Sequence, residues 1–148
     1  MRTLKQLKFS HQLCFPIYAL SRLITSHYQP LLGELDLTYP QYLVMLLLWE
    51  HQSMNVKNLG ETLMLDSGTL TPLLKRLETK KLVKRVRSKE DERIVNIQLT
   101  PQGAALEQQA AEIPLRLADS LGVTPDEIQE LKDAVTPLLY RLKPALKC

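Results

Sequence analysis

Small hydroxyl and basic side chains share one side of the segment from Asp66 to Arg76. Hydroxyls at a helix start let the helix lie deep in a major groove, and later cations reach phosphates or guanine edges. The other side carries leucines at helical i, i+3, i+4 and i+7 spacing: Leu70, Leu73, Leu74 and Leu77. The segment therefore predicts a DNA-reading helix with these candidate contacts: Asp66, Ser67, Thr69, Thr71, Pro72, Lys75 and Arg76.

The boundaries of this helix follow from its first residues. Asp66 or Ser67 can cap it, and Pro72 predicts a kink or a later helix start. Upstream, Asn55 can cap a shorter helix, and Met64 and Leu65 then form the turn between the two. The pair has the organisation of a helix-turn-helix.

Two segments downstream predict a β hairpin. Residues 82–88 place basic side chains among β-branched ones, and residues 95–99 alternate apolar and polar residues as a half-buried strand does. Arg85 on the basic strand is a further candidate DNA contact. Arg93 at the charged tip suits insertion into a narrow minor groove, with Asp91 orienting it.

The charge of the chain is concentrated in this region. Residues 66–100 hold 9 Lys and Arg against 5 Asp and Glu, a net charge of +4, whereas the remainder has 10 against 11, a net charge of −1. A solvated hairpin on an ordinary domain is the alternative interpretation. Basicity confined to one segment favours nucleic-acid binding instead.

Cys14 is the other residue with reactive chemistry. Ser10 can cap a long helix around it, and Pro16 inside that helix would free the carbonyl of Gln12 and bend the segment. The thiolate is the reactive form, and the positive end of a helix dipole favours it, although Cys14 would lie one turn in. The alternative is a small buried hydrophobic residue, and the residues alone leave both interpretations open.

The remaining segments predict long helices. Pro40 lies in the first turn of a nearly all-apolar helix, residues 101–121 form another, and a capping box at 124–127 starts the last. Pro114 and Pro137 predict kinks. A small DNA-reading module cannot cover all this apolar surface, so we expect a second copy to bury it. A twofold dimer would place two reading helices about 34 Å apart, as a palindromic site requires.

The predicted fold is therefore mainly α with a two-stranded β wing. Residues 1–148 form a single chain unit, in which 39–100 are the winged helix-turn-helix and 1–38 and 101–148 are dimerisation helices. With 148 residues and 45% hydrophobic content, the chain can bury one good core. It has no transmembrane run and no signal peptide, which predicts a soluble cytoplasmic protein without membrane partners.

Other chemistries lack their sequence patterns. The three histidines are scattered without metal-ligand spacing, and no glycine-rich phosphate loop or nucleophile elbow is present. No metal, cofactor or catalytic residue is predicted. Two cysteines near opposite ends of such a chain predict reduced thiols and no disulfide framework.

Four stretches closely resemble the organic hydroperoxide resistance regulators of the MarR family. They are Gln12-Leu13-Cys14-Phe15, Leu37-Thr38-Tyr39-Pro40-Gln41-Tyr42-Leu43, Leu65 to Arg76, and Asp91-Glu92-Arg93. The similarity runs from about Phe9 to Gly103 and continues more loosely to the end. An early cysteine followed by Thr-Tyr-Pro-Gln-Tyr marks the peroxide-sensing branch.

The resemblance implies a homodimeric repressor, not an enzyme, that leaves operator DNA when its early cysteine is oxidised. By this similarity the sensing thiol is Cys14, Tyr28 and Tyr39 hydrogen-bond to it, and Tyr18 lines the same pocket. Cys14 and Tyr28 are two heptads apart on one helix, about 21 Å at 1.5 Å per residue. We therefore expect the tyrosine of one subunit to reach the cysteine of its partner.

The fate of oxidised Cys14 depends on a second thiol. A sulfenic acid condenses with another protein thiol or with a small cellular one. Related regulators with a resolving cysteine resemble one another in carrying it before the last helix, where this chain has none. Cys148 of the partner subunit and a low-molecular-weight thiol are the two candidates.

Two other functions remain open at this stage. A MarR-type regulator could sense a small aromatic ligand with Cys14 merely packing, which insensitivity to cumene hydroperoxide would reveal. A thiol peroxidase would consume peroxide steadily without DNA affinity. The basic wing beside a polar helix argues against the peroxidase.

Overall fold

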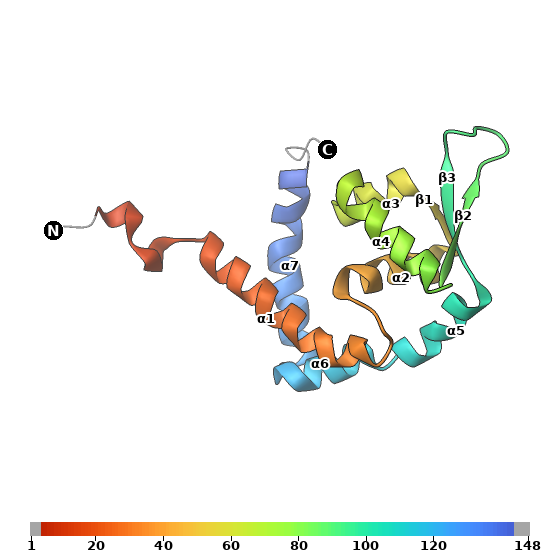
Figure 1. Cartoon of the computed structure of the whole chain (residues 1–148). Coiled ribbons are helices and arrows are strands. Elements are labelled where there is room, and N and C mark those ends of the chain that lie inside the picture. The colour runs from red at the N-terminus through yellow and green to blue at the C-terminus, as the bar shows by residue number, and fades with distance from the viewer. Residues whose placement is uncertain (1–3, 144–148) are drawn as a thin grey trace.

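A computed structural model describes residues 4–143 (Figure 1). The elements in chain order are the 3-10 turns η1 (Lys5–Leu7) and η2 (Phe9–His11), then α1 (Cys14–Gly33), α2 (Tyr39–His51), β1 (Ser53–Asn55), α3 (Val56–Leu63), α4 (Ser67–Thr79), β2 (Val83–Arg87), β3 (Val95–Leu99), α5 (Pro101–Ala110), α6 (Ile113–Leu121) and α7 (Pro125–Leu142). The mainly helical winged helix-turn-helix is confirmed.

Helix α2 lies at the centre of the core because it is apolar on nearly every side. Its Val44, Met45 and Leu48 are fully buried, and Thr38 and Gln41 close a capping box at its start. Helices α3 and α4, the sheet and α5 all pack around it. The core continues into α4 through the predicted leucine stripe, which is buried throughout.

The sheet differs from the predicted two-stranded wing. Among the described residues it has three antiparallel strands in the order β1-β3-β2, with Met54 opposite Ile97 and Arg85 opposite Ile97 on the other side. β1 has three residues and no alternating pattern of its own. It pairs with a strand some forty positions away, so local periodicity could not reveal it.

The start of α1 is also different from the prediction. Ser10 lies in η2, and the residue before α1 is Leu13, which has helical dihedral angles and no side-chain cap bond. Cys14 is therefore the first residue of the helix and not one turn in. Pro16 falls in the first turn, where no amide donor is needed, so the predicted bend does not arise from it.

The predicted helix from 101 to 121 is two helices. Helix α5 ends at Ala110 and α6 starts at Ile113. The cause is Pro114, which cannot donate to the carbonyl of Ala110, so its predicted kink is a complete break. Within residues 4–143, proline occupies the first or second position of α2, α5, α6 and α7.

The junction between α5 and the sheet is tightly closed at Gly103. A Cβ atom there would lie 2.0 Å from the carbonyl oxygen of Leu82, so the position excludes every side chain. The carbonyl of Gly103 accepts the indole N–H of Trp49 at 2.9 Å. The start of β2, helix α5 and helix α2 are therefore held together at Gly103.

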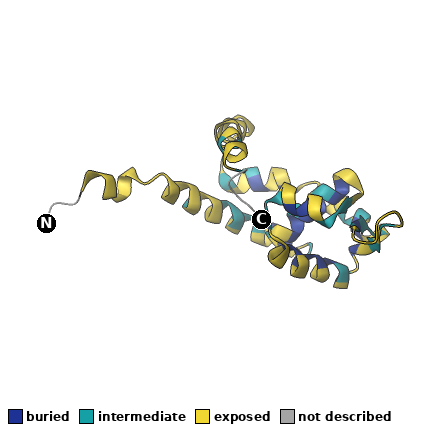
Figure 2. Cartoon of the chain, turned by 90° about the horizontal axis from the view of Figure 1, so that it is seen from above, coloured by how far each residue is buried: buried dark blue, intermediate teal, exposed yellow. Residues whose placement is uncertain are grey.

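The outer helices expose apolar surface in the single chain. The first half of α1 projects from the body (Figures 1 and 2), and α7 has no buried residue. Large exposed side chains on the two helices are Phe15, Ile17, Tyr18, Leu20, Leu23, Ile128, Leu131, Val135, Leu139, Tyr140 and Leu142.

Candidate redox site and nucleic-acid interface

The exposed side of α4 carries the predicted DNA-reading residues. The Asp66 carboxylate caps the helix by accepting the amide N–H of Thr69 at 2.7 Å. The helix starts at Ser67 and continues through Pro72, so the predicted later start is wrong. The predicted contacts on α4 are all exposed: Ser67, Thr69, Thr71, Pro72, Lys75 and Arg76.

The wing presents Arg93 at an ordered tip. The backbone N–H of Arg93 donates to Asp91 Oδ1 at 3.0 Å, and Arg93 itself is exposed. Ser88 accepts the amide N–H groups of Glu90 and Asp91 at 3.2 and 3.4 Å. Ser88 was not among the predicted site residues, although a serine before a charged turn is a known signal for such hydrogen bonds.

Arg85 lies against α4 in this structure. Its guanidinium donates to the carbonyl of Thr71 at 3.4 Å and lies 3.5 Å from the Glu78 carboxylate. These contacts connect the first strand of the wing to the reading helix. The role of Arg85 in contacting DNA remains a prediction, as do the roles of the other named residues.

Cys14 is an exposed thiol at the amino end of α1. The first amide N–H groups of a helix have no partner within it, and together with the dipole they favour an anion there. Tyr18 lies one turn further along, exposed, with the guanidinium carbon of Arg22 5.4 Å from its ring centre. Cys148 lies outside the described residues.

The other two predicted tyrosines lie together at the far end of α1. The ring of Tyr28 is 4.8 Å from that of Tyr39 and 5.8 Å from that of Tyr42. Tyr42 was missed, although it is one turn after Tyr39 on α2. We call these three residues the tyrosine cluster.

Burial keeps the tyrosine cluster protonated. Desolvation, followed by the neighbouring phenols, raises the pKa of Tyr28 to about 12, and desolvation raises the pKa of Tyr39 and of Tyr42 as well. Neutral phenols keep their O–H groups, which can donate hydrogen bonds to an anionic sulfur.

Within one subunit the structure does not bring Cys14 to the tyrosine cluster. Cys14 and Tyr28 of the cluster both lie on helix α1, so the distance between them along the helix is about 21 Å at 1.5 Å per residue. The rigid helix cannot fold back to close this distance. A site that combines the two needs a second chain.

The described residues show neither a metal cluster nor a membrane span. Between residues 4 and 143, no group of three or more His, Cys, Asp or Glu side chains could hold a metal ion. Over the same residues, none of the helices is both long and apolar enough to cross a bilayer.

Comparisons with known proteins agree with this geometry. Residues 26–109 match the family model described as transcriptional regulator SarA/Rot. The organic hydroperoxide resistance transcriptional regulator of Bacillus subtilis is 50% identical over 136 residues, 92% of each chain.

Solved structures extend these similarities to proteins on DNA. Reduced AbfR bound to DNA, from Staphylococcus epidermidis, has 36% identity and a TM-score of 0.76, over 93% of this chain and 96% of that chain. The overoxidised AbfR–DNA structure scores 0.75, and AbfR with its disulfide formed scores 0.64. A MarR mutant of E. coli with operator DNA has 27% identity and a TM-score of 0.79, over 93% of this chain and 99% of that chain.

Proposed function

Because the chain belongs to the organic hydroperoxide resistance regulators of the MarR family, we propose that Cys14 is its sensing thiol. The protein is a redox-sensing transcriptional repressor that binds DNA. Reduced protein holds a palindromic operator as a homodimer, through the exposed side of α4 and Arg93 of the wing. Oxidation by an organic hydroperoxide releases it.

The main support for this proposal is the distance along α1 between Cys14 and Tyr28 of the tyrosine cluster. The apolar faces of α1 and α7 are exposed in the single chain, and a second chain can bury them. A twofold pairing along α1 places the sulfur of each chain beside the tyrosine cluster of the other. Their phenols donate to the thiolate, and each sensor site then belongs to the interface that spaces the two reading helices.

The chemistry at sulfur is balanced as follows. The Cys14 thiolate attacks one peroxide oxygen, the O–O bond breaks, and the alkoxide leaves as an alcohol after taking a proton. Sulfur is oxidised to a sulfenic acid and the hydroperoxide is reduced. A second thiol, either Cys148 of the partner subunit or a low-molecular-weight thiol, then displaces water and forms a disulfide.

Disulfide formation, and not negative charge on sulfur, is the proposed releasing step. Related AbfR has been solved bound to DNA in both its reduced and its overoxidised form. The fold of this chain is closer to those two forms than to disulfide-formed AbfR. A disulfide adds a covalent constraint at the interface, which an overoxidised sulfur does not.

The first test uses Cys14→Ser. The variant should bind operator DNA like the reduced wild type and stop responding to cumene hydroperoxide. Mass spectrometry of the wild type after one equivalent of oxidant should identify a Cys14–Cys148 bridge or a mixed disulfide. Loss of DNA binding in Cys14→Ser would show that Cys14 is a packing residue.

A mixed dimer tests the two-chain site directly. One subunit carries Cys14→Ser and the other Tyr28→Phe. If the site spans two chains, the remaining Cys14 faces an intact Tyr28 and reacts at the wild-type rate. If the site lies within one chain, that cysteine has lost its tyrosine and reacts as slowly as the Tyr28→Phe homodimer.

A further inference from the structure

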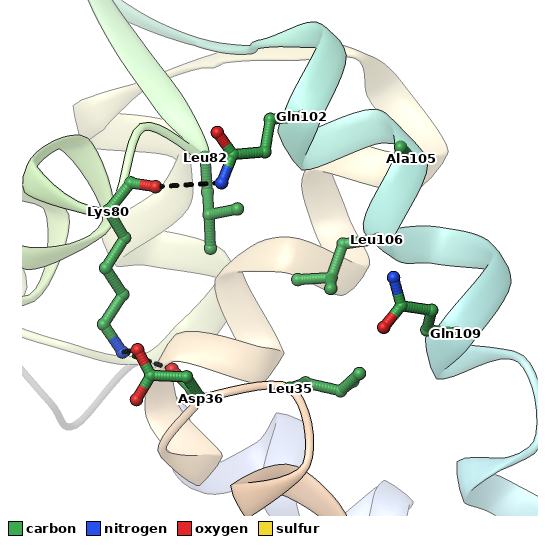
Figure 3. A pocket seen from close by; sticks show the side chains of 8 residues that line it. All are labelled: Leu35, Asp36, Lys80, Leu82, Gln102, Ala105, Leu106 and Gln109. Carbon is green, nitrogen blue, oxygen red and sulfur yellow. Dashed lines mark hydrogen bonds and ion pairs between the residues drawn. The ribbon is translucent and has the colours of Figure 1, made fainter.

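Lys80 connects the end of the reading helix to the turn between α1 and α2 (Figure 3). It is the residue that ends α4, and its Nζ donates to the backbone carbonyl of Asp36. Nζ also lies 3.1 Å from the Asp36 carboxylate and 3.5 Å from Gln41 Oε1. The carbonyl of Lys80 accepts Gln102 Nε2 of α5 at 3.5 Å, so one residue joins three parts of the fold.

The same turn leads directly into the tyrosine cluster. Thr38 caps α2, and its backbone N–H donates to Gln41 Oε1 at 3.0 Å, the oxygen that Lys80 also contacts. Tyr39, the next residue, packs on Tyr28. A displacement of Tyr39 therefore moves the first turn of α2 and the oxygen to which Lys80 is bound.

The three acceptors on Lys80 do not contribute equally. The Asp36 side chain is 88% exposed, so solvent screens its ion pair. Gln41 is only 3% exposed, and the carbonyl of Asp36 belongs to the backbone, so it moves only when the turn itself moves. These two oxygens, and not the exposed carboxylate, determine where the ammonium lies.

Packing leaves the turn free to move on one side. An open pocket of about 280 Å³ lies beside Lys80, lined among others by Leu35, Leu82 and Leu106 (Figure 3). Close-packed side chains transmit displacements by contact, but no side chain fills this pocket between the turn and α5. On the side of this pocket, the hydrogen bonds of Lys80 therefore determine where the Asp36 turn lies relative to α4.

We infer that Lys80 is the positioning residue through which the tyrosine cluster acts on the DNA-reading helix. The inference rests on the proposed function. Movement of Tyr39 on oxidation of the facing sulfur shifts Gln41 and the Asp36 turn. Lys80 pulls the end of α4 with them, and the reading helix leaves its alignment with the groove.

Lys80→Met tests this, because it keeps the apolar stem and removes the ammonium. The matched control is Lys81→Met, the same change of charge at the exposed neighbouring position. The probe is a duplex selected from a random library by the reduced wild-type protein. Kd is measured for reduced and cumene hydroperoxide-treated protein at two salt concentrations, beside the rate of Cys14 oxidation.

In Lys80→Met the ratio of oxidised to reduced Kd should fall at least about tenfold relative to wild type. Its reduced Kd should stay within about threefold of wild type, since exposed ion pairs contribute little. The rate of Cys14 oxidation should not change. Lys81→Met should keep the full ratio, and Lys80→Arg should restore most of it.

An unchanged ratio in Lys80→Met would overturn the inference. Equal weakening in both redox states with a shallower salt dependence would overturn it too, because Lys80 would then be a phosphate contact. If Lys80→Met does not fold, Lys80→Gln removes the ammonium and keeps a polar side chain, and an unchanged ratio there has the same consequence. If oxidation does not change the Kd of the wild-type protein, the proposed function is wrong, and that result is distinct from a failure of the Lys80 inference.

Discussion

The half built from α2, α3, α4 and the sheet buries its core within one chain, whereas the first half of α1 and all of α7 leave theirs open. The residues that we propose to contact DNA lie mainly on this complete half, and Cys14 lies on the open half, at the end of an exposed helix. Under the proposed function, DNA binding uses a surface that is preformed in each chain, while sensing uses a surface that forms only when two chains meet.

The largest effect is expected at Gly103, where α5 packs against the complete half. Gly103→Ala should destabilise the protein by about 3 kcal/mol, because the new Cβ would overlap the Leu82 carbonyl oxygen and force the backbone apart. Urea unfolding measures this. Gly33→Ala is the control, since nothing lies within 4 Å of its Cβ, and it should gain at most about 1 kcal/mol. Equal stabilities would show that the junction yields easily.

The second prediction concerns the open half. Leu131→Asp on α7 should weaken the dimer by at least about 2 kcal/mol, because it places a charge in the apolar interface. Sedimentation should show monomers, while hydrogen exchange in α2 and α4 stays protected. Gln108→Asp introduces the same charge on the exposed side of α5 and should leave the dimer intact. A stable Leu131→Asp dimer would place the interface elsewhere.

Arg93→Ala probes the complete half at its tip. DNA binding should weaken by about 2 kcal/mol and lose about one unit of salt dependence. The Tm should not change, because Arg93 is exposed and its backbone keeps the bond to Asp91. Lys132→Ala removes the same charge from α7 and should bind DNA normally. A large loss of Tm in Arg93→Ala would make it a structural residue.

The smallest effect is a pH dependence of the tyrosine cluster. Burial raises the pKa of Tyr28 to about 12 from an ordinary value of 10.0, so the folded state holds this proton more tightly than the unfolded chain. The resulting stabilisation is present below pH 10 and is lost as the pH rises toward 12. Tyr28→Phe should flatten this part of the stability profile in thermal melts. An identical alkaline loss in wild type and variant would exclude Tyr28 as its source.

Local signals predicted much of the complete half. The caps at Asn55 and Asp66, and the leucine stripe of α4, depend on residues within one or two turns. Their geometry is decided by neighbours along the chain, so the sequence pattern is sufficient.

Predictions that depended on distant residues were less successful. β1 exists because β3 offers it hydrogen bonds, and Arg85 turns toward Glu78 because folding brings α4 beside β2. The tyrosine cluster gathers from two helices, so Tyr42 could not be assigned to it from spacing on one of them. Ser10 failed as a cap because a second 3-10 turn intervenes before α1.

The prolines that open α2, α5, α6 and α7 restrict how the two halves can move. A helix cannot lengthen backward through its own leading proline, because the ring clashes with the preceding turn and disfavours helical geometry in the residue before it. These four helices therefore keep their starting residues when they move. They can pivot as whole rods about their starts, without winding or unwinding there.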